Sequence, residues 1–91
     1  MNTTHKIKNT TYTVHTIETK PHRDGQSTET ILLATRTTSR SHKQFIVFYN
    51  ETPRSELQPV SISILDSNGH RVWGGKHGDD IREAVNLHMS K

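Results

Sequence analysis

The sequence contains no cysteine in its 91 residues. This absence excludes a disulfide framework, a thiolate metal site and a cysteine nucleophile. A secreted domain of this size usually needs disulfide staples, so their absence favours a cytoplasmic, reducing location.

Long apolar runs are also missing. No run approaches the roughly 18 residues that a membrane span needs, and the opening MNTTHKIKNTTY holds no apolar segment typical of an export signal. Apolar residues make up 29% of the chain, which is below the usual globular share, but they fall in short dense runs. We therefore expect a single soluble domain, residues 1–91, with a small core and no membrane association.

What the chain does have is threonine. Its 13 threonines are β-branched and suit the pleated surface of a sheet. Alternating or two-sided apolar patterns predict that the chain is strand-rich from about 6 to 73. The expected strands are Lys6 to about Glu18, about Glu29–Arg36, Gln44–Asn50, Val60–Ile64 and His70–Trp73.

Turn signals separate these strands. Asp24-Gly25 and Asn68-Gly69 both favour tight hairpin turns, the second of a primed type. In the first strand, Tyr12 and Val14 share one face while Ile7 and Ile17 point to the other, which indicates a bulge or a contact specific to one end.

A helix is expected at about residues 80–89. Asp80 and Glu83 have the spacing of a capping box. The apolar side of this helix holds Ile81, Ala84, Val85, His88 and Met89. The predicted fold is therefore α+β: a meander of about five antiparallel strands packed against one C-terminal helix.

The positive charge is concentrated in the first half of the chain. Residues 1–48 hold seven Lys/Arg against three acids, whereas residues 49–91 hold five against six. The segment RTTSRSHK, residues 36–43, joins two apolar strands, and its cations and hydroxyls are suited to phosphate contacts. If the first hairpin lies beside this turn, their charges form one stripe that can follow a polyanion.

The candidate residues for binding nucleic acid or a partner share a positive charge or an exposed ring. Phe45, Phe48 and Trp73 are expected in the core, which leaves the two tyrosines as exposed rings for base stacking. The candidates are Lys6, Lys8, Lys20, Arg23, Arg36, Arg40, His42, Lys43, Tyr12 and Tyr49.

No motif indicates a cofactor or a metal. The glycines before the helix lack the spacing of a phosphate-binding loop, and Asp79 and Asp80 would repel a phosphate there. The seven histidines match no recognised ligand spacing, and we expect His88 to be a packed histidine.

These observations favour a non-enzymatic protein that binds RNA or single-stranded nucleic acid through its phosphates. In size and mixed charge the chain also resembles small accessory proteins of bacteriophages and mobile elements, which implies a second reading. In that reading it inhibits a host nucleic-acid-handling or defence enzyme, with Tyr12, Tyr49 or Leu87 adding apolar contact.

A third reading is a metal-independent ribonuclease, for which the candidates are His42, Arg40, Lys43 and Glu29. A homodimer formed through the edge strands is compatible with any of the three readings.

Overall fold

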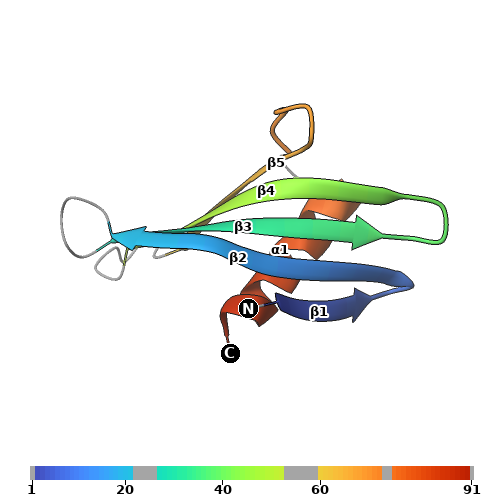
Figure 1. Ribbon diagram of the computed structural model, residues 1–91, viewed down its shortest axis with the longest axis horizontal. Helices are drawn as coiled ribbons and strands as arrows, with labels where there is room; N and C mark the ends of the chain where they lie inside the picture. The colour runs from blue at the N-terminus through green and yellow to red at the C-terminus, as the bar shows by residue number, and fades with distance from the viewer. Residues whose placement is uncertain (1, 22–26, 53–59, 73–74, 91) are drawn as a thin grey trace.

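The computed structural model describes residues 2–21, 27–52, 60–72 and 75–90. These residues form a five-stranded antiparallel sheet in the order β1-β2-β3-β4-β5, with one helix across one face (Figure 1). The predicted α+β fold is confirmed. Its elements are β1 (Asn2–Ile7), β2 (Thr10–Pro21), β3 (Thr28–Thr37), β4 (His42–Glu51), β5 (Val60–Leu65) and α1 (Gly75–Met89).

The first predicted strand is a hairpin rather than one strand. β1 and β2 pair from Ile7↔Thr10 outward, so Lys8 and Asn9 alone form the turn. Lys8 has φ 51°, a left-handed conformation that glycine adopts more readily. No glycine marks this turn, which is why the sequence pattern does not show it. The turn also places Ile7 against the same core as Tyr12, not on the opposite face.

The bulge expected in this region is confirmed. The β2–β3 register shifts between Thr16 and Glu18, so Ile17 is the extra residue. Before the bulge, Tyr12 and Val14 are fully buried, whereas Ile17 is 51% exposed. The bulge thus ends the buried stretch of β2.

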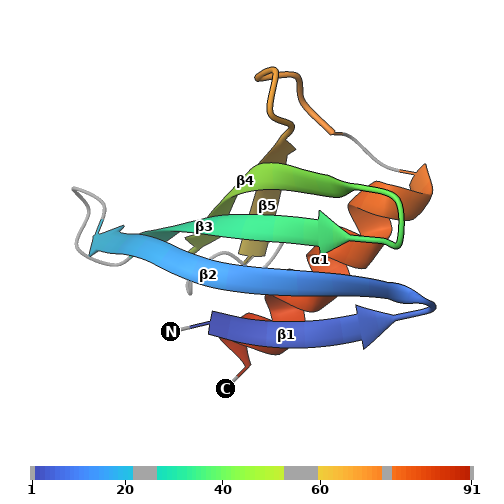
Figure 2. The same cartoon turned by 45° about the vertical axis from the view of Figure 1, so that its right-hand side comes forward.

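The core lies between the sheet and α1. Its strand residues alternate along β2 to β5, and its helix residues recur at helical spacing as predicted. It comprises Tyr12, Val14, Leu32, Ala34, Phe45, Val47, Tyr49, Ile64, Ile81, Ala84 and Val85. The other side of the sheet, here called the open face, carries Ile31, Leu33, Ile46 and Phe48 on β3 and β4, all half-buried. No described element lies over the open face in either view (Figures 1 and 2).

The last predicted strand is reduced to a single bridge between Leu65 and Arg71, and Trp73 lies outside the described residues. The preceding turn is not of the primed type. The Gly69 amide donates to the Asp66 carbonyl at 3.0 Å, and Gly69 has φ 81°. This is the pattern of a type I turn followed by a left-handed glycine.

The helix begins at Gly75, five residues before the predicted start at Asp80. Asp80 therefore lies inside the helix and does not cap it, so the capping-box prediction was wrong. The run GGKHG has low helix propensity and resembles a loop by composition. Asp80 instead accepts a hydrogen bond from the Tyr12 hydroxyl at 3.4 Å.

His88 joins the last turn of α1 to the first two strands, and its prediction as a packed histidine is confirmed. Its Nδ1 lies 2.6 Å from the Thr3 hydroxyl and its Nε2 lies 2.7 Å from the Thr16 hydroxyl. The side chain is 8% exposed. His5 Nε2 extends the network to Thr3 at 2.8 Å.

We expect His88→Ala to lower the free energy of unfolding by about 2–3 kcal/mol, because it removes one buried and one partly buried hydrogen bond and leaves a void. Leu87→Ala is the control, since Leu87 is 46% exposed and its loss should cost less than about 0.5 kcal/mol. Urea unfolding measures both. Equal losses would contradict the anchoring role of His88.

We expect Lys8→Gly to raise the free energy of unfolding by about 1 kcal/mol, because glycine adopts the left-handed backbone of the β1–β2 turn without strain. Lys6→Gly, two residues earlier in β1, should lower it instead, since glycine weakens a strand. Thermal unfolding of both variants tests the turn. A loss of stability in Lys8→Gly would contradict it.

Candidate nucleic-acid interface

The antiparallel order brings two turns to the same end of the sheet. β1 and β3 run in one direction and β2 and β4 in the other, so the Lys8–Asn9 turn and the 38–41 turn lie side by side (Figure 1, right-hand end). Thr11 pairs with Thr37, so the two turns lie at a similar position along the strand direction. The last residue of β2 and the first of β3, Pro21 and Thr28, are paired at the other end of the sheet.

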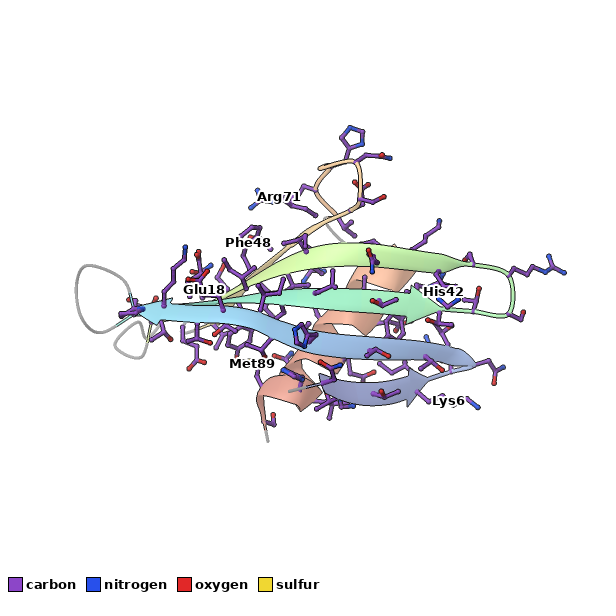
Figure 3. The ribbon with its side chains drawn as sticks, in the orientation of Figure 1. Lys6, Glu18, His42, Phe48, Arg71 and Met89 are labelled. Atoms are coloured by element: carbon purple, nitrogen blue, oxygen red, sulfur yellow. The ribbon has the colours of Figure 1, made fainter. Side chains whose placement is uncertain are left out.

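Six of the predicted binding residues lie at this end, and we call them the basic end. They come from β1, the first turn and the β3–β4 hairpin. They are Lys6, Lys8, Arg36, Arg40, His42 and Lys43. Figure 3 shows Lys6 and His42 here, with Glu18 toward the opposite end.

The other two predicted cations do not join the basic end. Lys20 lies near the far end of β2, where it pairs across the strands with Glu29. Opposite charges in such positions attract, so Lys20 is poorly placed to add to a basic stripe. Arg23 lies outside the described residues.

Acidic residues are absent from the strand segments that form the basic end. Residues 2–17 and 30–50 contain no Asp or Glu, and Glu18 and Glu29 lie toward the opposite end. Five permanent cations, at positions 6, 8, 36, 40 and 43, thus share one end of the sheet, and the strand segments that carry them hold no acid at this end. Asp66 and Asp80 are the acids that approach from other elements.

The 38–41 turn is held by its own hydroxyls. The Thr38 hydroxyl accepts from the amides of Arg40 at 3.3 Å and Ser41 at 3.2 Å. The Thr38 amide donates to the Ser41 carbonyl at 3.0 Å. The amides of Arg40 and Ser41 are therefore used within the turn and are not available to a phosphate. The exposed tip consists of Ser39 and Arg40.

A hollow of about 310 Å³ adjoins the basic end on the helix side of the sheet. Arg36 and Lys43 are cross-strand partners and both line it. Asp66 and Asn68 line it from the turn after β5, and nothing in the sequence pattern of this turn indicates more than a change of chain direction. The Asp66 carboxylate accepts from the amides of Asn68 and His70, each at 2.9 Å, so it is held by the turn. The remaining lining includes the apolar side chains Phe45 and Val72.

Arg36 is only partly satisfied in its position. It is the cross-strand partner of Tyr12 and interacts with the Tyr12 hydroxyl. Of the described side chains that are not exposed, Arg36 holds the single buried polar atom without a hydrogen-bond partner, its Nε. A buried donor of this kind costs free energy in the unliganded protein.

The expectation that Tyr12 and Tyr49 are exposed rings was wrong. Tyr12 is 0% and Tyr49 8% exposed, and both belong to the core. The hydroxyl of Tyr12 reaches Asp80, which allows its ring to be buried. Phe48, expected in the core, is instead half-buried on the open face, whereas Phe45 is buried as predicted. No described aromatic ring is thus exposed at the basic end.

The four candidates for ribonuclease chemistry do not meet. Arg40, His42 and Lys43 lie at the basic end, but Glu29 lies eight residues from Thr37, the partner of His42. At about 3.3 Å per residue the separation is about 26 Å. A general acid or base must reach its proton within hydrogen-bond distance, so Glu29 cannot act with His42.

Within the described residues, no three His, Asp or Glu side chains are grouped closely enough to hold a metal ion. The helix in that part of the chain is also too short and too polar to cross a membrane. Comparisons with protein-family models, curated proteins and solved structures found no match to this chain.

Burial raises the pKa of Tyr12 above 10.0, the usual value for tyrosine; Arg36 opposes this rise and Asp80 adds to it. Burial also raises the pKa of Tyr49, and the negative charge of Glu51 adds to that rise. We therefore expect both phenols to ionise above pH 10 in an absorbance titration near 295 nm. The unfolded chain ionises first, so their contribution to stability is complete below pH 10 and is lost above it. Tyr12→Phe and Tyr49→Phe should each remove one such transition. Titration of either ring at the value of free tyrosine would contradict its burial.

Proposed function

We propose that the protein binds RNA or single-stranded DNA through its phosphates at the basic end, without catalysis. The observation that carries this proposal is the collection of five permanent cations at one end of the sheet, from two hairpins whose strands there hold no acid. Such a concentration of one charge attracts polyanions and raises their association rate.

The spacing of the two hairpins suits a flexible strand. Neighbouring strands lie about 4.8 Å apart, so the two turns, two strand positions apart, are about 10 Å from each other. A single strand can bend to bring consecutive phosphates to both. Arg36 and Lys43 would hold a further phosphate at the mouth of the hollow, which both side chains line.

The burial of both tyrosines changes the expected mode of binding. Base stacking by exposed rings usually supplies affinity beyond the phosphate contacts. Phe48, the nearest half-exposed ring on β4, lies five residues from Lys43, or about 16 Å along the strand. Binding should therefore depend mainly on charge, be strongly sensitive to salt and depend little on base sequence.

We expect the logarithm of the association constant for a fluorescent oligouridylate to fall with the logarithm of salt concentration with a slope of roughly −3, the value for about four neutralised phosphates. Arg40→Ala and Lys8→Gly should each weaken binding and make the slope shallower by about 0.7. Fluorescence anisotropy at several salt concentrations measures both quantities.

Lys20→Ala is the matched control, because it removes one cation from the far end of the same sheet. It should leave affinity and slope unchanged. A flat salt response of the parent protein, or an equal effect of Lys20→Ala and Arg40→Ala, would refute binding at the basic end.

The same experiment separates the two alternative functions. An inhibitor of a host enzyme would use these cations against acidic side chains and would not bind the bare oligonucleotide. A ribonuclease would shorten the oligonucleotide in EDTA and would lose this activity in His42→Ala. An oligonucleotide that is bound and stays intact supports the proposal against both.

A further inference from the structure

The open face carries an apolar patch at the part of the sheet away from the basic end. Two rows of cross-strand partners form it. One row is Ile31 and Phe48, and the other is Leu33, Ile46 and Leu65; all five side chains are half-buried. Ile17, at the bulge beside Ile31, is 51% exposed. Contiguous apolar side chains on a sheet face that no described element covers are a candidate interaction site.

The first of these rows has opposite charges at its two ends. The registers align Glu18 on β2, Ile31 on β3, Phe48 on β4 and Ser63 on β5. Arg71 Nη2 donates to the Ser63 hydroxyl at 3.1 Å, which places the guanidinium at the β5 end of the row. Figure 3 shows Glu18, Phe48 and Arg71 in this order across the strands.

Glu18 and Arg71 cannot pair within one molecule. They are separated by three strand spacings, or about 14 Å. The row is nevertheless complementary to itself when reversed, because its negative end then meets a positive end and its apolar middle meets an apolar middle. Self-complementarity is the requirement for a two-fold interface between identical chains.

We propose that two copies of this chain pack open face to open face about a two-fold axis that runs along the strands, between β3 and β4. This axis exchanges β2 with β5 and β3 with β4. It sets Ile31 against Phe48 of the partner copy and Leu33 against Ile46 of the partner copy. Glu18 of each copy then meets Arg71 of the partner copy, so the interface gains two equivalent ion pairs.

The charges also select the direction of the axis. An axis across the strands at the level of Phe48 leaves each residue on its own strand and sets Glu18 against Glu18 of the partner copy. Like charges at an interface are unfavourable, so this arrangement is disfavoured. Either axis leaves the strands of the two sheets aligned, as in packed twisted sheets at about 30° and about 10 Å apart, so the charges decide between the two axes.

The proposed axis has a consequence for the basic end. Rotation about an axis along the strands keeps the strand direction, so both basic ends point the same way in the dimer. Ten permanent cations, five from each copy, would then face one strand of nucleic acid. Two linked sites bind a long polyanion more tightly than one. This consequence rests on the proposed function, whereas the dimer itself does not.

Sedimentation equilibrium of the full chain without nucleic acid tests the dimer. We expect the parent protein to sediment as a dimer and Phe48→Asp to sediment as a monomer. Circular dichroism should show that Phe48→Asp is still folded. Leu87→Asp, on the exposed side of α1, is the matched control and should remain a dimer. A parent protein that stays monomeric would overturn the proposal and leave the open face to a different occupant. A dimer that Phe48→Asp does not affect would also overturn it, and would indicate pairing through the edge strands.

A charge exchange tests the geometry without altering the apolar patch. Glu18→Arg and Arg71→Glu should each weaken dimerisation about tenfold or more, since each places like charges together twice. The double variant Glu18→Arg with Arg71→Glu should recover most of the loss. Failure of the double variant to recover would contradict the axis along the strands. Because nucleic acid is absent, the result is independent of binding at the basic end.

Discussion

The packing of α1 against one face of the sheet decides which side chains are buried and which remain at the surface. A single helix covers one face of five strands, so the large side chains of β2 to β5 either meet it or remain on the open face. Ile81, Ala84 and Val85 supply the apolar contact, and His88 fixes the helix to Thr3 and Thr16. Because Tyr12 and Tyr49 belong to this layer, they are withdrawn from solvent. Because Ile31, Leu33, Ile46 and Phe48 do not belong to it, they form a second apolar surface.

The meander then distributes charge along the sheet. Alternate turns of an antiparallel meander lie at the same end, so the chain separates its charges by placing cations in and beside two turns and acids toward the opposite end. Lys8 occupies a strained left-handed position at one of these turns. A lysine at a position where glycine would be favoured costs stability.

Much of this fold follows from local pattern. The two-sided apolar character of β3 and β4, the alternation in β5 and the buried side of α1 are all present in the sequence. The hairpin at Lys8 is not, because its turn has no glycine and its two strands form one continuous β-branched run. The start of α1 was also hidden, since GGKHG has loop-like composition, and the Asp80 capping signal belonged to a residue that bonds Tyr12 instead.

The candidate site depends on topology, which the sequence shows less directly. That the first and second hairpins lie side by side was an expectation, and it holds for Lys6 and Lys8. It fails for Lys20, because successive turns of a meander lie at opposite ends of the sheet and Lys20 lies at the end that is level with Glu29. An amide chemical-shift map of the protein during titration with a single-stranded oligonucleotide shows directly which residues contact the nucleic acid. Binding at the basic end should give the largest changes at residues 6–9 and 36–43 and little change at 18–20 and 28–31. Changes centred on the second set, or spread evenly over the sheet, would contradict it.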